Sequence, residues 1–350
     1  MELTPEIKAQ LEEQKKQCIF CKLISGEMPA KTVFEDDTVI AMMDIYPALK
    51  GHFTYMLKEH YPIMPYIPAD EFTHLFGLIP QLSEAAQSGL IKTGMTVFIA
   101  NGGVAGQQSP HFLLHFLPRD KGDGFFNFMF KCNESLEDEK LKVLSNNFPI
   151  MMSNHFKRNP ASWHLGNGES VSFLKDVYEN SNVLYEDEKV LCVIPEKGAV
   201  AGHIEIYSKA EEKDITKVSI EDSAHLFFTA SLAATLVFEG LGAQGTNIIL
   251  KSGLTDDNLN GKLCIHVLPR FEEDSLKEML WQPTQPEYDV DDIASQIKNN
   301  TWKVKYTEEK KEVVEKKESV VKEPTVIKIG EKKSSNPEDE IKEAIERMKN

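Results

Sequence analysis

The side chains best suited to chemistry gather in one short segment, residues 106–119, which reads GQQSPHFLLHFLPR. His111, Leu113 and His115 alternate along it. Because side chains two positions apart on a strand point to the same face, we expect these three to share one face. A neutral imidazole can act as a nucleophile, a general base or a metal ligand. Leu113, which stands between the two histidines, can do none of these.

A second chemical motif, Cys18-x-x-Cys21, lies near the start of the chain. Such a pair can be a redox pair, half of a zinc site or a coincidence. The chain has five cysteines, an odd number, and residues 1–17 are polar and charged without the features of a signal peptide. We therefore expect reduced or metal-bound thiols rather than disulfides, and a cytoplasmic location.

The elements that must position these residues occur twice, at a constant offset of 151 positions. Matched positions are Glu35 and Glu186, Gly51 and Gly202, His74 and His225, Gly94 and Gly245, and His115 and His266. Two unrelated domains that share commonplace dipeptides would not keep one offset over such a span. The repeat therefore predicts two copies of one domain.

Each copy predicts the same succession of elements. Strands are expected at residues 38–44, 96–99 and 112–117, and again at 189–194, 247–250 and 263–268. One helix per copy lies between them. In the first copy it starts near Asp70 and ends before Gly89. In the second copy it starts at Ser219, where Asp222 forms a variant capping box, and it ends before Gly240. This is an α+β fold, an antiparallel sheet with a packed helix.

We divide the chain into five parts. They are an N-terminal helix (1–17), a first domain (18–125), a connector with a helix (126–180), a degenerate second domain (181–285) and a charged tail (286–350). The tail ends in an amphipathic helix over residues 336–350, capped by Asn336, which could dock on a protein partner or fold back on its own domain.

Composition argues against two classes of partner. The 350-residue chain carries a net charge of −16, which disfavours sequence-independent binding of nucleic acid. No stretch approaches the roughly 18 consecutive apolar residues that a membrane-spanning helix needs, so we expect no membrane association.

Together with Glu35-Asp36-Asp37, Asp44, Gly51-His52 and Asn101-Gly102, the two motifs resemble the histidine-triad (HIT) superfamily of nucleotide hydrolases and transferases. The resemblance covers about residues 18–125. In that family the middle histidine of the triad attacks the α-phosphate of a nucleotide and forms a covalent nucleotidyl intermediate. Here that position is Leu113, so the resemblance implies that the first copy has no nucleophile.

The second copy places Lys262, Cys264 and His266 at the three triad positions. A thiolate at Cys264 could attack phosphorus, or Cys264 could be a small buried residue. The family's phosphate-binding positions become Ser252, Asp257 and Asn258, and its ribose-binding aspartate becomes Pro195. We expect Asp257 to repel phosphate, and the second copy to be structural.

In the first copy the resemblance assigns Asp44 to the ribose hydroxyls and Asn101, Gly106, Gln107 and His115 to the phosphates. Family members that open with a cysteine pair complete a zinc site with two histidines, whose positions here are His60 and His111. Since protein fills all four positions, with Cys18 and Cys21, this zinc would be structural.

Three functions follow from these expectations. The first is a purine-mononucleotide-binding protein without a nucleophile, acting as a regulator or adaptor. The second is a scaffold with both pockets closed. The third is an active nucleotide hydrolase or transferase with an atypical nucleophile, an alternative that Leu113 disfavours. In all three, the two copies are expected to pair within the chain as a pseudo-dimer.

Overall fold

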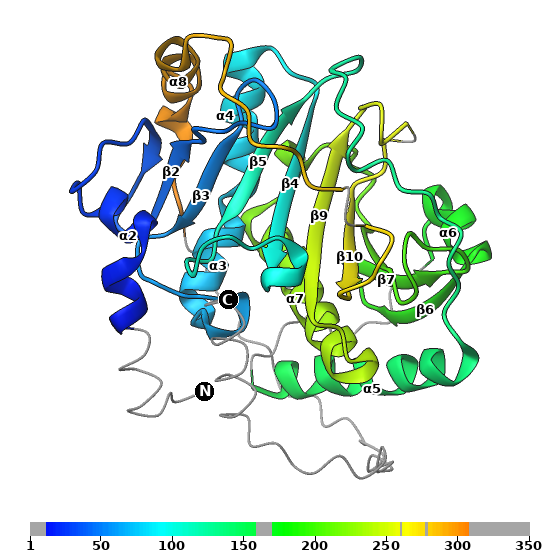
Figure 1. The fold of residues 1–350 in the computed structure, drawn as a ribbon. Helices are drawn as coiled ribbons and strands as arrows, with labels where there is room; N and C mark the ends of the chain where they lie inside the picture. Colours follow the sequence, from blue (N-terminus) through cyan, green and yellow to red (C-terminus); the bar gives the residue numbers. More distant parts are fainter. Residues whose placement is uncertain (1–11, 159–169, 260, 277–278, 308–350) are drawn as a thin grey trace.

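A computed structural model describes residues 12–158, 170–259, 261–276 and 279–307. In this part of the chain the strands form one ten-stranded sheet in the order β1-β2-β3-β5-β4-β9-β10-β8-β7-β6 (Figure 1). Every pairing between neighbouring strands is antiparallel. The predicted antiparallel α+β class is therefore confirmed.

The sheet consists of two halves with the same internal order, five strands each. The first half contains β1 (Thr32–Glu35), β2 (Val39–Met43), β3 (Phe53–Leu57), β4 (Gly94–Asn101) and β5 (Leu114–Arg119). The second contains β6 (Ser181–Glu186), β7 (Val190–Pro195), β8 (Ile204–Ser208), β9 (Gly245–Gly253) and β10 (Cys264–Arg270). From edge to centre the halves run β1-β2-β3-β5-β4 and β6-β7-β8-β10-β9. They meet where β4 pairs with β9, from Gly94 opposite Gly253 to Asn101 opposite Thr246.

Helices cover one face of the sheet. In the first half these are α3 (Ala69–Gly77) and α4 (Ile79–Leu90), and in the second half α7 (Ile220–Leu241) takes the place of both. Pro80 stands in the first turn of α4, where its missing N–H is tolerated, and the helix breaks just before it. The equivalent residue in α7 is Ser231, so that helix continues. Ser219 caps α7 by accepting a hydrogen bond from the Asp222 N–H at 3.1 Å, as predicted.

Gly89 and Gly240 do not end their helices, which run on to Leu90 and Leu241. A Cβ on Gly89 would lie 2.5 Å from the carbonyl oxygen of Gln296, and one on Gly240 would lie 2.7 Å from Leu144 Cδ2. The two glycines therefore allow close packing against two further helices, α8 (Val290–Lys298) and α5 (Asp138–Arg158).

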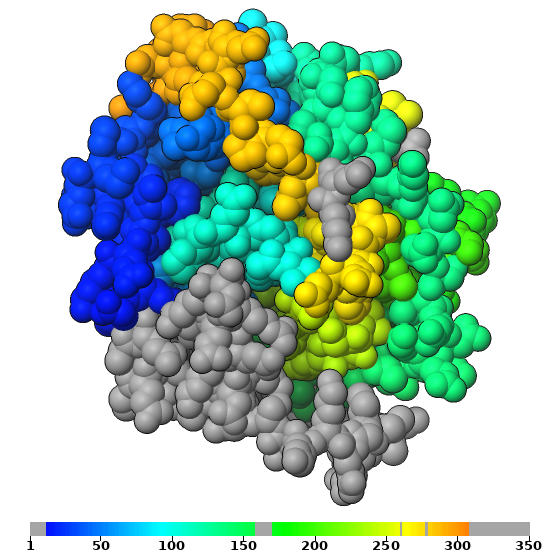
Figure 2. Space-filling model, in the orientation of Figure 1, coloured from blue at the N-terminus to red at the C-terminus, as the bar shows by residue number. Residues whose placement is uncertain are grey.

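These two helices are exchanged between the halves. After β5, residues 120–137, the first arm, lead to α5, which packs on α7 and β6 of the second half. After β10, residues 271–276 and 279–289, the second arm, lead to α8, which packs on α4 and β1 of the first half (Figure 1). Figure 2 shows the second arm, coloured gold, on the surface of the molecule.

The predicted boundaries change in consequence. Residues 286–350 are not simply a charged tail, because α8 buries Ile293, Ala294 and Ile297 against the first half and is capped by Asp289. Along the chain, α5 and α6 (Lys175–Glu179) lie between the strands of the first half and those of the second. Residues 12–17 are helical and lead to α2 (Ile19–Ile24). The predicted helix over 336–350 lies outside the described residues.

One helix of the described chain, α7, is long and apolar enough to cross a membrane by length and composition. The sequence alone indicated no such stretch. In the structure 56% of its apolar window is buried, and the helix packs against α3, α5 and β10. A core helix meets the same criterion, so this finding is weak support for a membrane span.

Candidate functional site

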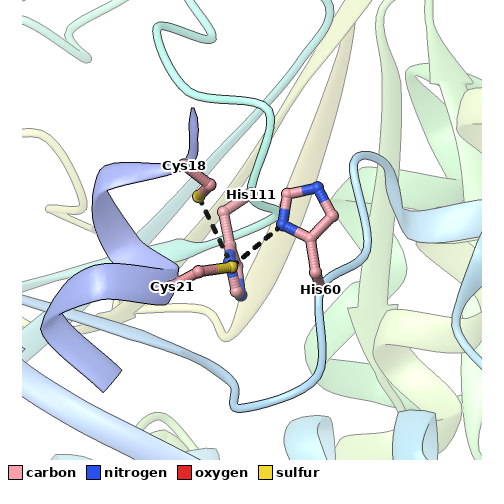
Figure 3. Close-up of side chains that lie close together, drawn as sticks. All are labelled: Cys18, Cys21, His60 and His111. Carbon is pink, nitrogen blue, oxygen red and sulfur yellow. Dashed lines mark hydrogen bonds between the residues drawn. The ribbon is translucent and has the colours of Figure 1, made fainter. Parts of the chain in front are cut away.

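Four side chains that could bind a metal ion, from three separate segments, converge beside the first half of the sheet (Figure 3). Cys18 and Cys21 lie at the start of α2, His60 follows β3, and His111 precedes β5. Cys18 Sγ is 3.7 Å from His111 Nδ1, and Cys21 Sγ is 3.6 Å from the same nitrogen and 3.3 Å from His60 Nδ1. The structure therefore brings together all four residues predicted to bind metal.

The spacing of these atoms suits a tetrahedral ion. With Zn–S about 2.3 Å and Zn–N about 2.0–2.1 Å, a tetrahedral zinc holds sulfur and nitrogen ligands roughly 3.6 Å apart. His111 Nε2 donates a hydrogen bond to the Leu57 carbonyl at 2.9 Å, which leaves the Nδ1 lone pair directed at the sulfurs. The donor set and its orientation both fit zinc.

The two thiols differ in acidity. A hydrogen bond from the Cys21 thiol lowers the pKa of Cys18 in spite of burial. The pairing with Cys18 raises the pKa of Cys21. One thiolate is therefore favoured at the cluster even before an ion binds, and a thiolate is the form that ligates zinc.

A chain of hydrogen bonds fixes the state of His115. The backbone N–H of Ala48 donates to His52 Nδ1 at 3.1 Å, so the hydrogen of neutral His52 is assigned to Nε2. That N–H donates to His115 Nδ1 at 2.9 Å, which leaves the hydrogen of His115 on its Nε2. Burial lowers the pKa of both histidines to about 3. His115 is thus a neutral N–H donor at pH 7, and its one lone pair is already in use.

Asp44 lies next to this pair, with Oδ2 3.7 Å from His52 Nε2 and 3.9 Å from His115 Nδ1. Its other oxygen accepts a hydrogen bond from the Tyr46 N–H at 2.8 Å. The structure therefore places Asp44 and His115, two of the predicted nucleotide-binding residues, side by side.

The other predicted nucleotide-binding residues have partners within the protein. Asn101 Nδ2 donates to Thr246 Oγ1, in the second half, at 3.2 Å. The side-chain amide of Gln107 accepts from the Gly102 N–H at 2.8 Å and donates to the carbonyls of Pro62 and Ser109 at 2.7 and 2.9 Å. Gln107 therefore shapes the loop through its side chain, which leaves that amide little capacity for a phosphate.

Leu113 precedes the last strand, because β5 begins at Leu114 rather than at Phe112 as predicted. Its side chain is partly buried against a small cluster on the sheet that includes Met42 and Met56, together with Phe20 and Leu23 of α2. Leu113 therefore takes part in the apolar contact between the sheet and α2.

The second arm covers the histidine pair. The Trp281 ring meets His52 and His115 edge-on, with ring centroids 5.3 and 5.2 Å apart. A Cβ on Gly106 would lie only 2.3 Å from Leu280 Cδ1, so this arm also lies against the predicted phosphate loop. Neither Trp281 nor Leu280 is among the site residues predicted from the sequence. The repeat is the sequence signal that could have identified Trp281, since this aromatic residue lies 151 positions after another, Phe130.

The second half carries the same arrangement. The Ala199 N–H donates to His203 Nδ1 at 3.2 Å, and His203 Nε2 lies 3.0 Å from His266 Nδ1. Phe130, in the first arm, lies 6.0 and 5.6 Å from these two rings. Glu205 is close enough for the three residues to resemble a metal cluster. Because the hydrogen of His203 Nε2 already occupies the space between the rings, they form a hydrogen-bond relay instead.

Cys264 is buried, and burial raises the pKa of its thiol well above the usual range. It packs among Leu174, Val177 and Tyr207. These surroundings fit a small buried residue better than a nucleophile. Asp257 is fully buried and lies 3.2 Å from Arg119 Nη1. Its charge is balanced within the protein, contrary to the expectation that it would repel phosphate.

Comparison with known proteins gives matches to part of the chain. The family model described as the HIT domain matches residues 25–122. An uncharacterized HIT-like protein of Methanocaldococcus jannaschii is 41% identical over 107 residues, which are 31% of this chain and 82% of that protein. Adenosine 5'-monophosphoramidase HNT1 of Candida albicans is 28% identical over 141 residues, covering 36% of this chain and 93% of that protein. A zinc-bound histidine triad family protein from Mycobacterium smegmatis is 31% identical, with coverages of 31% and 80% and a TM-score of 0.29.

Proposed function

Because the chain belongs to the histidine-triad (HIT) family, we propose that its first half binds a purine mononucleotide without turning it over. A relative in this family is named as an adenosine 5'-monophosphoramidase, which supports AMP as the ligand to test first. The observation that carries the proposal is Leu113 at the position of the nucleophile, while Asp44 and His115 remain together beside it.

The roles of the residues follow from their chemistry. His115 would donate its Nε2–H to a phosphate oxygen, and the Asp44 carboxylate would accept hydrogen bonds from the ribose hydroxyls. A nucleotidyl intermediate needs a free lone pair next to the phosphorus. Leu113 has none, and the Nδ1 lone pair of His115 is taken by His52. The nucleotide would therefore be held but not attacked.

We also propose that Cys18, Cys21, His60 and His111 hold a structural zinc ion. Four protein ligands leave no open position for a substrate or a water. The ion would add stability and would tie α2 to the segments around β3 and β5.

The second half, in this proposal, is a degenerate copy of the first, and the two form a pseudo-dimer within one chain. The common strand order, the β4–β9 pairing and the exchanged helices α5 and α8 support it. With no catalysis, the protein would act as a cytoplasmic regulator or adaptor. A protein partner for residues 336–350 stays a prediction.

Calorimetric titration of the zinc-loaded chain with AMP and GMP tests the proposal, with the same samples checked for hydrolysis of an adenosine phosphoramidate. We expect binding and no hydrolysis, and at least about tenfold weaker binding in Asp44→Ala, because a charged hydrogen-bond partner is lost. Asp37→Ala removes a carboxylate at an exposed position and serves as the matched control. Hydrolysis by the unmodified chain would instead favour an active enzyme with an atypical nucleophile.

A scaffold without a ligand is the second candidate, and the contacts of Leu280 and Trp281 with Gly106 and His115 favour it. Trp281→Ala separates the two functions. Nucleotide binding that appears only in Trp281→Ala would show that the second arm closes a competent site. Absence of binding in both proteins would leave the scaffold.

A further inference from the structure

The Cys18-x-x-Cys21 pair has a second chemical capacity, because two neighbouring thiols can be oxidised to a disulfide. Cys18 is the N-cap residue of α2, and Cys21 lies in the first turn of the same helix. Residues three positions apart on a helix are neighbours, and the two sulfurs lie within 4.8 Å of each other (Figure 3). A disulfide joins sulfurs about 2 Å apart, so rotation of the two side chains would close the gap.

The other three cysteines of the described chain are placed differently. Cys192 and Cys264 are buried in β7 and β10, which β8 separates. Cys132 is exposed in the first arm. In the pair, Cys18 is only 1% exposed, whereas Cys21 is partly exposed. A small oxidant can therefore reach one thiol of the pair and find the second beside it.

Helix α2 depends on the Cys/His cluster for its attachment to the sheet. None of its residues, Ile19–Ile24, is buried. Phe20 and Leu23 are only partly buried where they pack on the sheet. Just before the helix, Lys15 pairs with Glu59, but the Glu59 side chain is 56% exposed and such surface pairs stabilise little. Loss of the cluster would therefore loosen α2.

We propose that Cys18 and Cys21 form a redox switch, in which oxidation of the pair by a peroxide releases the zinc ion and loosens α2. This inference rests on the zinc site proposed above. A disulfide sulfur is no longer a thiolate, so oxidation leaves His60 and His111 as the remaining ligands. Two ligands are too few for a structural zinc site, which uses four.

The oxidation transfers two electrons from the two thiolates to the peroxide. Cys21, the more exposed, attacks one oxygen of hydrogen peroxide. The O–O bond breaks, hydroxide leaves and a sulfenic acid forms on Cys21. The Cys18 thiolate then attacks the Cys21 sulfur, the S–O bond breaks and a second hydroxide leaves. Two protons from solvent convert the hydroxides to water.

Treatment of the zinc-loaded full chain with hydrogen peroxide tests this inference. A chromogenic chelator measures zinc release, and peptide masses without reduction identify the disulfide. We expect release of about one zinc ion per chain, a disulfide between Cys18 and Cys21, and recovery of both thiols and zinc after dithiothreitol and added zinc. Trypsin cleavage after Lys22, in α2, should rise at least about threefold on oxidation. Cys132→Ser removes an exposed thiol outside the pair and should leave zinc release unchanged.

Cys21→His gives a second comparison, because it keeps four nitrogen and sulfur ligands but removes the partner thiol. Its zinc release by peroxide should be at least about tenfold slower than that of the parent. If this variant holds no zinc, the peptide masses of the parent decide alone.

Three results would overturn the inference. Zinc could stay bound while Cys132 is oxidised, Cys18 and Cys21 could end as sulfinic acids that dithiothreitol does not reduce, or a zinc-loaded Cys21→His could lose its ion as fast as the parent. A reduced chain that takes up no zinc would instead refute the zinc site itself, before any oxidant is added.

Discussion

In our proposal, a single side chain, Leu113, decides whether the first half can do covalent chemistry. Leu113 packs against a cluster on the sheet that includes Met42 and Met56, and Phe20 and Leu23 of α2 pack against the same cluster. Leu113→His would return an imidazole to this position at a packing cost of about 1 kcal/mol. We expect hydrolysis of an adenosine phosphoramidate to rise at least about tenfold above the parent, since acid–base and nucleophilic groups contribute factors of this size or more.

Cys264→His is the matched control, because it makes the corresponding change in the second half. That half has Pro195 in place of Asp44, so we expect no gain from it. Equal activity in the two variants would mean that Asp44 does not select the functional half. No gain in Leu113→His, with the fold intact, would mean that more than the nucleophile has been lost.

The buried histidines should make stability depend on pH. Burial lowers the pKa of His52, His115 and His203 to about 3, whereas an unfolded chain protonates histidine near 6.5. Between these values the unfolded state binds more protons. Their contribution to stability is therefore present above about pH 6.5 and is lost as pH falls toward 3, by up to about 1.4 kcal/mol per pH unit for each histidine.

Urea unfolding at several values between pH 6.5 and 4.5 measures this slope. His52→Gln can keep both hydrogen bonds, because its amide oxygen can accept from Ala48 and its amide nitrogen can donate to His115. It removes one titrating group, so its slope should be shallower than that of the parent. An unchanged slope would show that His52 is not held neutral in the folded chain.

At the scale of elements, the two halves attach their first helix by different means. In the first half the Cys/His cluster can hold α2 through a metal ion. In the second half Lys262 replaces His111, and it ion-pairs with Asp176 of α6. Asp176 is 62% exposed on its side chain, and such surface pairs contribute at most about 1 kcal/mol.

This difference predicts unequal effects of mutation. Cys21→Ser should remove most of the stabilisation by zinc, about 4 kcal/mol when the free ion stands a thousandfold above its dissociation constant. Lys262→Gln should cost less than about 1 kcal/mol. Chemical unfolding with and without a chelator gives both values. A chelator that leaves the parent's stability unchanged would contradict the proposed zinc site.

The sequence predicted most elements because hydrophobic periodicity and capping are local signals. Ser219 caps α7 as expected, and the strands lie within a few residues of their predicted bounds. Gly89 and Gly240 were misinterpreted as helix ends, because close packing and chain reversal both select glycine. What distinguishes them is contact with α8 and α5, which a local pattern does not contain.

For a similar reason, some residues of the candidate site could be predicted from the sequence and others could not. The four residues of the proposed zinc site follow a family motif, although they come from three separate segments. Trp281 and Leu280 follow no motif, because they reach His115 and Gly106 only through the exchange of the arms. Likewise, α5 begins at Asp138 and the equivalent residue, Asp289, caps α8, yet the sequences of the two helices differ. A packed helix needs only an apolar stripe, which many sequences can supply.

At the scale of the whole molecule, the exchange of arms makes each half depend on the other. Helix α8 covers the first half and α5 covers the second, while β4 and β9 join the two halves through eight residue pairs. Separation would expose both strand edges and the apolar faces beneath both helices. We therefore expect the halves to remain together after the chain between them is cut.

A protease site inserted after residue 165, between α5 and β6, tests this expectation. After cleavage at low micromolar concentration, the two fragments should elute together at the volume of the uncut chain and separate only in denaturant. The uncut protein with the same insertion is the control. Two folded fragments that elute separately would refute the pseudo-dimer, because each half would then be complete without the helix and central strand of the other. Joint elution would instead mean that one cooperative unit spans both halves, so that a ligand bound in one half also stabilises the other.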